Sequence, residues 1–217
     1  MAKITNTAVY GLDEAIYRSG YPMMTEPPTP EEFDKQVKMI YADRFTGDYT
    51  NPHIKRAIKL ANAKGGGHDQ FLTGITVTMD MTFSNKAWVE AERYTFLNFI
   101  SSMSTMHRIA KMDLKDACNY YVDSRAIRYA EELQVWYKNV QADPDVSDED
   151  KLEAYRALLY NLPSGFELTA SMVTNYRCLK NIYAQRRTHR LPDWQVFCDW
   201  VEQLPMAGEL ITGKGGV

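Results

Sequence analysis

Between residues 75 and 82, apolar and polar side chains alternate strictly along the chain. Isoleucine, valine and methionine occupy the odd positions, while threonine and Asp80 occupy the even ones. A period of two residues is typical of a strand that buries one face against a core. The pattern therefore predicts a sheet strand here, and we expect further strands to pair with it.

Elsewhere, apolar residues recur at spacings of three and four, which predicts helices. One such stretch begins at Lys86 and reaches Met103, where closely spaced serines favour a helix end or a functional loop. The last helix begins at Pro192, a residue type suited to a first helical turn. The helices predicted in this way cover residues 12–18, 54–63, 86–103, 121–140, 152–162, 168–187 and 192–204.

Proline, glycine and serine mark the boundaries between these elements. Four prolines between Tyr21 and Glu32 predict a loop, and the glycines at 65–67 are expected to end a helix rather than to bind a phosphate. Ser147 is placed to cap the helix that follows it. Because we find no repeat and no interdomain linker, we expect residues 1–217 to form one domain with a flexible tail at 212–217.

Composition narrows the classes of function. The 217 residues carry a formal net charge of −3, which argues against the uniformly basic surface of a general nucleic-acid binder. No apolar run reaches the roughly 20 residues needed to cross a bilayer, and the first residues contain no apolar signal core. Three scattered cysteines and four histidines lack disulfide or metal-ligand spacing, so we expect a cytoplasmic protein without a metal site.

The segment from Asn175 to Arg190 is the first candidate for chemistry, because it holds five cationic side chains and no acid. On one helix, Asn175 and Arg186 would lie within about 20° of each other, and Arg177 and Asn181 would share another side. Arginine forks beside asparagine amides suit phosphates and amide-bearing bases. A solvated basic helix face would have the same composition, so both interpretations stay open.

The second candidate is the segment from Glu90 to Arg108, which mixes arginines, hydroxyl groups and His107 with aromatic residues. Such a mixture can hold a phosphate, but an ordinary amphipathic helix contains it too. A Ser–His hydrolase would need a Gly-x-Ser-x-Gly turn, which this segment lacks. The chain also has neither a Walker loop nor a Gly-x-Gly-x-x-Gly motif.

Read in order, these residues resemble the flavin-dependent thymidylate synthases. That family carries Leu-Pro, then an Asn-x-Arg-x-Leu-x-Asn helix, then an arginine, and the stretch LPSGFELTASMVTNYRCLKNIYAQR from Leu162 to Arg186 has this order. In the family, the asparagine and arginine face contacts FAD, and the later arginine binds the phosphate end of dUMP. The resemblance gives these roles to Asn175, Arg177, Asn181 and Arg186.

The resemblance extends upstream over most of the chain, more remotely. GLDEAIYRSG is similar to the family's first helix, GGGHDQFLTGITVTMDM to its histidine-containing turn and following strand, and KAWVEAERYTFLNFISSMSTMHR to its Arg-His-Arg signature loop. Arg93 matches the first signature arginine, whereas Tyr94 and Thr95 replace the histidine and the second arginine. Gly74 replaces a flavin-contacting histidine. These departures mark a divergent branch and leave flavin and nucleotide binding as the main expectation.

The resemblance implies an α+β fold, with a central, mainly antiparallel sheet flanked by helices. It also implies reductive methylation of dUMP to dTMP with FAD, with methylenetetrahydrofolate as carbon donor and NADPH as reductant, in a homotetramer with active sites between subunits. The implied catalytic residues are Arg93, Ser102 and Ser104. The implied cofactor residues are Arg93, Tyr94, Asn175, Arg177 and Asn181. The implied substrate residues are Glu90, Ser102, Ser104, His107, Arg108, Arg156 and Arg186.

Two alternatives stay open at this point. The replaced signature histidine and arginine favour a related flavoenzyme that modifies another pyrimidine nucleotide, for example by hydroxymethylation. A non-catalytic nucleotide-binding or assembly protein on the same fold is the second alternative. In each case we expect small anionic ligands rather than a nucleic acid or a membrane.

Overall fold

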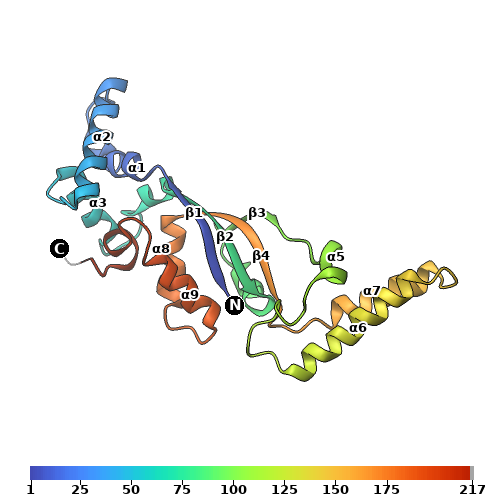
Figure 1. The fold of residues 1–217 in the computed structure, drawn as a ribbon. Helices are drawn as coiled ribbons and strands as arrows, with labels where there is room; N and C mark the ends of the chain where they lie inside the picture. The colour runs from blue at the N-terminus through green and yellow to red at the C-terminus, as the bar shows by residue number, and fades with distance from the viewer. Residues whose placement is uncertain (216–217) are drawn as a thin grey trace.

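A computed structural model describes residues 1–215 and shows one α+β domain built on a four-stranded sheet (Figure 1). The strands are β1 (Lys3–Tyr10), β2 (Thr76–Ser84), β3 (Asn98–Ser102) and β4 (Glu167–Asn175), arranged in the order β1-β2-β4-β3. Every neighbouring pair is antiparallel. This architecture confirms the predicted fold class.

Helices lie at both ends of the sheet and beside it (Figure 1). In the described residues these helices are α1 (Leu12–Arg18), α2 (Pro30–Thr46), α3 (Pro52–Ala61), α4 (Asn85–Ala91), α5 (Thr105–Arg108), α6 (Ser124–Ala142), α7 (Asp148–Tyr160), α8 (Tyr176–Arg186) and α9 (Pro192–Val201). Short helical turns η1 (Tyr21–Met23), η2 (Gln70–Gly74), η3 (Ile109–Lys111) and η4 (Gly208–Thr212) link them. Figure 1 shows α1–α3 at one end of the sheet, and the α6–α7 hairpin projecting from the other end.

The main core lies between the sheet and helices α8 and α9. The odd positions of β2 are buried as the alternation predicted, and they belong to the same cluster as Trp194 and Phe197 of α9. Trp200 of α9 also donates to the Thr7 hydroxyl of β1 at 2.9 Å, which ties the helix to the sheet edge. A smaller cluster holds the base of the α6–α7 hairpin, where Leu158 and Phe166 are fully buried.

Several sequence predictions are confirmed. Helix α1 has the predicted bounds, and α3, α6, α7 and α9 lie where periodicity places them. The Ser147 hydroxyl caps α7 by accepting from the Asp150 backbone amide at 3.2 Å. The proline-rich loop ends earlier than predicted, because Thr29 and Glu32 form a capping box that starts α2 at Pro30.

Two predicted helices are wrong over part of their length. Residues 168–175 belong to strand β4, and only the part from Tyr176 onward is helical. Met172 fits both a period of two and a period near four, so the local pattern did not decide between strand and helix. The strand forms because β2 and β3 pair with it on its two edges and satisfy its backbone groups.

The second correction concerns residues 86–103. Helix α4 ends at Ala91, and the chain then returns as the edge strand β3 beside β4. The side chains of Phe99 and Ile100 are more than half exposed. The apolar residues at helical spacing in this segment therefore do not form the buried face of a helix. Asn175 and Arg186 therefore share no helix face, because Asn175 ends β4 and caps α8.

The C-terminal part of the described chain packs back onto the domain. Residues Gly208–Thr212 form a π-helical turn with buried Leu210 and Ile211. The Gly215 amide donates to the Gly208 carbonyl at 2.9 Å. Of the tail expected to be flexible, residues 216–217 lie outside the described residues. Within residues 1–215, no helix combines the length and the apolar character needed to span a membrane.

Candidate functional site

The residues predicted to bind a cofactor meet in one hollow of about 610 Å³, which we call the α8 hollow. Its wall is made by turn η2, by the segment after α4, and by the end of β4 with α8. All five predicted cofactor residues contribute to this wall, although they come from two distant parts of the chain. They are Arg93, Tyr94, Asn175, Arg177 and Asn181.

The α8 hollow is electropositive. Arg93, Arg177 and Lys180 line it together with a single carboxylate, that of Asp69, which leaves a net charge of +2. Asp69 bridges two of the cations, with Oδ1 3.2 Å from Arg177 Nε and Oδ2 2.9 Å from Lys180 Nζ. Burial alone raises the pKa of Asp69, but Lys180 and Arg177 outweigh it and hold that pKa below its usual value.

Two amide side chains of the hollow have their oxygen atoms engaged inside the protein. Asn175 Oδ1 accepts from the Cys178 backbone amide at 2.9 Å as the cap of α8, so its Nδ2 group remains for a ligand. Gln70 Oε1 accepts from Arg177 at 2.6 Å, which leaves Gln70 Nε2 in the same way. A wall of cations and N–H donors suits a multiply charged anion with many acceptor oxygens.

Cys178 also lines the hollow, where a thiolate could act as a nucleophile. Burial raises the pKa of its thiol above the usual value. A thiol of this kind stays protonated at neutral pH and is unreactive. The site therefore offers binding groups rather than a cysteine nucleophile.

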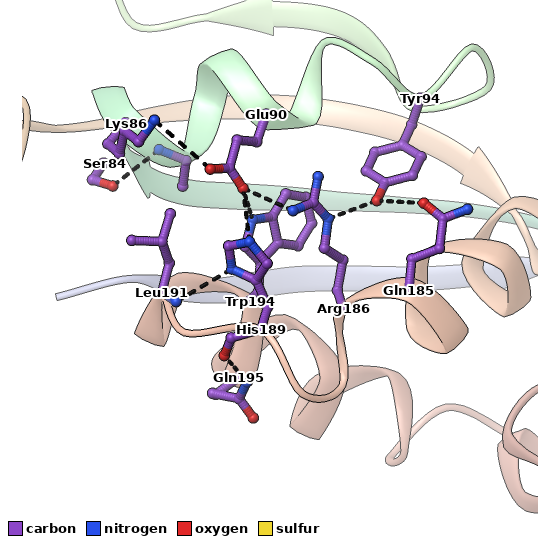
Figure 2. A network of polar contacts seen from close by, with 11 residues as sticks. Ser84, Lys86, Glu90, Tyr94, Gln185, Arg186, His189, Leu191, Trp194 and Gln195 are labelled. Atoms are coloured by element: carbon purple, nitrogen blue, oxygen red, sulfur yellow. Dashed lines mark hydrogen bonds and ion pairs between the residues drawn. The ribbon is translucent and has the colours of Figure 1, made fainter.

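A buried polar network lies beside the hollow and is centred on Arg186 (Figure 2). Arg186 NH1 donates to Glu90 Oε2 at 2.8 Å, and Arg186 Nε donates to the Tyr94 hydroxyl at 2.6 Å. The guanidinium carbon lies 4.5 Å from the centre of the Trp194 ring. Trp194 Nε1 donates to the same Glu90 oxygen at 3.1 Å, and His189 Nε2 lies 3.3 Å from it.

Arg186 is therefore satisfied inside the domain. Its side chain is only 9% exposed, and its charge is balanced by Glu90 from α4. The structure brings Glu90 and Arg186, both predicted to bind substrate, into direct contact. A direct contact of Arg186 with a phosphate stays a prediction.

The other predicted substrate residues lie elsewhere. Ser104 and Arg108 line a second hollow of about 340 Å³ with Lys3, Thr82 and Glu167, which we call the α5 hollow. The Ser104 hydroxyl also caps α5 by accepting from the His107 backbone amide at 3.4 Å. Three more predicted residues are exposed and line neither hollow: Ser102 on β3, His107 on α5 and Arg156 on α7.

The two hollows stand at opposite ends of strand β4. Glu167 begins β4 at the α5 hollow, and Asn175 ends it at the α8 hollow. Eight residues of extended strand separate them by roughly 26 Å. One chain therefore does not bring Ser104 and Arg108 together with the predicted cofactor residues.

A third hollow, the largest of the three at about 830 Å³, lies on the far side of turn η2 and was not predicted. It shares Gln70 and Thr73 with the α8 hollow, and Arg18, Tyr21 and His68 also line it. The segments that build it, GLDEAIYRSG and GGGHDQFLTGITVTMDM, resemble family segments, but the resemblance gave no site role to Arg18, Tyr21 or His68. Sequence reasoning gave no site role to Asp69, and it counted Lys180 only among the cations of the segment from Asn175 to Arg190, although Lys180 follows Arg177 by about one helical turn.

Comparison with known proteins adds to this geometry. No family model matches the chain, and no curated protein matches its sequence. Among solved structures, flavin-dependent thymidylate synthase ThyX from Helicobacter pylori, complexed with FAD and dUMP, matches with a TM-score of 0.61 at 14% identity. That match covers 97% of this chain and 98% of the other.

The fold is ThyX-like. A second Helicobacter pylori ThyX structure with FAD and dUMP gives a TM-score of 0.59 at 15% identity, over 99% of both chains. The UMP/dUMP methylase PolB from Streptomyces cacaoi, bound with 5-Br dUMP, gives 0.54 at 13% identity, over 99% of this chain and 95% of PolB. The resemblance seen in the sequence is thus confirmed as a shared ThyX-like fold over nearly the full length.

Proposed function

We propose that the chain binds FAD in the α8 hollow and catalyses the reductive methylation of dUMP to dTMP. The observation that carries this proposal is the wall of that hollow, whose three cations and one carboxylate leave a net charge of +2, because this charge complements the two negative charges of a pyrophosphate. The ThyX-like fold supports it, since two ThyX structures of this fold contain FAD and dUMP.

The residues present fit the cofactor. Arg177, Lys180 and Arg93 would neutralise the pyrophosphate, and the outward amide of Asn175 would donate to a further acceptor of FAD. FAD, when bound, supplies the hydride chemistry, with methylenetetrahydrofolate as the carbon donor and NADPH as the reductant. The protein orients the ligands and excludes water. The adjoining 830 Å³ hollow offers room for a second planar ligand beside FAD.

Ser104 and Arg108 would bind the nucleotide from a second copy of the chain. This follows from the separation of roughly 26 Å between the two hollows along β4, which one nucleotide does not bridge. Edge strand β3 runs between them and exposes Phe99 and Ile100, and Phe96 just before the strand is exposed as well, which makes an apolar edge typical of an interface. We therefore propose a homo-oligomer, a homotetramer as the family resemblance implies, with each site shared between subunits.

Two measurements test the proposed function. The purified chain should acquire the visible absorption of bound flavin when FAD is added. With folate and NADPH present, it should then release tritium from dUMP labelled at C5. FAD binding without tritium release would reject the thymidylate synthase reaction, while a protein that binds no FAD would reject the flavin site altogether.

A second candidate function has its own support. PolB shares the fold and is described as a UMP/dUMP methylase, so a related flavoenzyme acting on another pyrimidine nucleotide is the alternative. Tyr94 and Thr95, which replace the family's signature histidine and arginine, favour it. Mass analysis of the products distinguishes a methylated from a hydroxymethylated base. Comparing the amounts of product formed from dUMP and from UMP identifies which sugar, deoxyribose or ribose, the protein prefers.

A further inference from the structure

A continuous chain of hydrogen bonds runs from the buried network to the α8 hollow. Arg186 NH1 donates to Glu90 at 2.8 Å and Arg186 Nε to the Tyr94 hydroxyl at 2.6 Å. Tyr94 continues to Gln185 Oε1 at 3.1 Å, and Gln185 Nε2 reaches Asn181 Oδ1 at 2.9 Å. Figure 2 shows the part from Glu90 to Gln185, with the Tyr94 hydroxyl between Arg186 and Gln185.

From Arg186 to Asn181, every hydrogen bond in this series points in the same direction, away from Arg186. A guanidinium has no acceptor atom, so the Tyr94 oxygen must accept from Arg186. The single hydroxyl hydrogen of Tyr94 is then left to donate, and it donates to Gln185 Oε1. Gln185 consequently offers its amide nitrogen to Asn181, and Asn181 has its oxygen engaged. The Nδ2 group of Asn181 is left for whatever fills the hollow.

We call the series of hydrogen bonds from Arg186 through Tyr94 and Gln185 to Asn181 the relay. We propose that the relay fixes Asn181 as a hydrogen-bond donor in the α8 hollow, and that Gln185 is the positioning residue that orients the Asn181 amide in this way. The atom of the ligand opposite Asn181 is then an acceptor, such as a phosphate or carbonyl oxygen. The inference rests on the proposed function, because it takes FAD as the ligand. It adds two residues outside the hollow wall, Gln185 and Arg186, to those that determine what the hollow accepts.

The two ends of the relay differ in how firmly they are held. Arg186 is buried, and Glu90 and Trp194 fix it from two sides. Gln185 and Asn181 are exposed, so water competes for their bond while the hollow is empty. A ligand that covers the hollow removes that water. If the Asn181 amide were turned the other way, its oxygen would then lie opposite an acceptor oxygen of the ligand, and neither oxygen would have a hydrogen-bond donor. The orientation of the Asn181 amide therefore affects the affinity for a ligand more than it affects the empty protein.

The same polarity recurs at two other amides of the hollow by independent contacts. Asn175 is turned by the α8 backbone and Gln70 by Arg177. In these three amides, which come from three elements, a protein donor occupies the oxygen, so the nitrogen is the group that remains for a ligand. The relay gives Asn181 the orientation that the other two amides already have.

The test uses substitutions at position 185 that keep the size of the side chain. In Gln185→Glu, the carboxylate accepts from Tyr94 but has no N–H for Asn181, so Asn181 must turn its Nδ2 toward residue 185. Gln185→Met breaks the relay without imposing the opposite polarity. Thr188→Glu adds the same charge at an exposed position three residues further, just after the end of α8 and outside the hollow wall, as the charge control.

Affinity for FAD and for inorganic pyrophosphate is measured by titration, at low and at high salt. We expect Gln185→Glu to weaken FAD binding about tenfold, Gln185→Met about threefold, and Thr188→Glu hardly at all. Because Coulomb repulsion is screened by salt, the loss in Gln185→Glu should persist at high salt if polarity causes it. The side-chain amide signals of Asn181 should shift on FAD addition in the wild type and not in Gln185→Glu.

The possible outcomes separate this inference from the proposed function. Equal FAD affinities for Gln185→Glu and Gln185→Met at high salt, with FAD bound by the wild type, would overturn the relay and leave the flavin site intact. Binding of pyrophosphate without FAD, with Gln185→Glu still the weakest variant, would reject FAD and support the relay. A wild-type chain that binds neither ligand overturns both.

Discussion

Replacing Glu90 by glutamine removes a charge on which several buried donors converge. Glu90 Oε2 lies 2.8 Å from Arg186 NH1, 3.1 Å from Trp194 Nε1 and 3.3 Å from His189 Nε2, and the Glu90 side chain is 18% exposed. Removing one partner of a buried ion pair outright costs about 3 to 5 kcal/mol. Glutamine keeps an acceptor oxygen, so we expect a loss of about 2 to 3 kcal/mol.

The assay for this loss is urea unfolding followed by circular dichroism, with Asp34→Asn as the matched acid-to-amide control. Asp34 pairs with Lys38 at 2.6 Å, but their side chains are 63% and 75% exposed, so its replacement should cost less than about 0.5 kcal/mol. For a chain of this size, Glu90→Gln should lower the melting temperature by roughly 4 to 12 °C. Equal losses in both variants would refute the claim that Glu90 is the buried counter-charge of Arg186.

Three further predictions concern single residues of the site and its walls. Asn175→Asp keeps the cap oxygen of α8 but loses the outward N–H group, so FAD affinity measured by fluorescence should fall about tenfold while the unfolding midpoint changes little. The lowered pKa of Asp69 implies stability that is complete above its usual value of 3.8 and lost as the pH falls through the lower folded-state pKa; acid unfolding of Asp69→Asn should lack this step. Gly11 has a φ of +74°, and a Cβ there would lie 2.6 Å from the Gly74 carbonyl oxygen, whereas a Cβ on Gly74 meets only ordinary contacts. Gly11→Ala should therefore destabilise the protein by more than about 1 kcal/mol and Gly74→Ala should not, as differential scanning calorimetry would show.

Local sequence patterns predicted those elements in which the buried residues recur at one clear spacing, either that of a helix or that of a strand. Helix α1 and strand β2 are of this kind, because their apolar positions all face the same core. Strand β4 was missed because it is followed without a break by α8, and its methionine and alanine positions suit both periods. Strands β1 and β3 lie at the sheet edges and bury few side chains, so their sequences carry little alternation.

The sequence singled out five residues that line one hollow, but it did not show how the side chains around that hollow pair with one another. The Asn-x-Arg-x-x-x-Asn spacing and Arg93 identified residues that the fold brings into one hollow. The contact between Arg186 and Glu90 joins residues 96 positions apart, and no local pattern contains it. The bridge from Asp69 to Lys180 is equally remote in sequence, so only the packing of η2 against α8 could show it.

The most direct test of the central claim is the visible spectrum of the purified chain after incubation with FAD and removal of free FAD by gel filtration. The α8 hollow, with its cations and outward amides, should retain flavin on the wild type, and Arg177→Gln should lose most of it because a direct charge–phosphate contact is removed. A wild-type chain that emerges colourless, or an Arg177→Gln variant that retains as much flavin as the wild type, would contradict the assignment of this hollow to FAD.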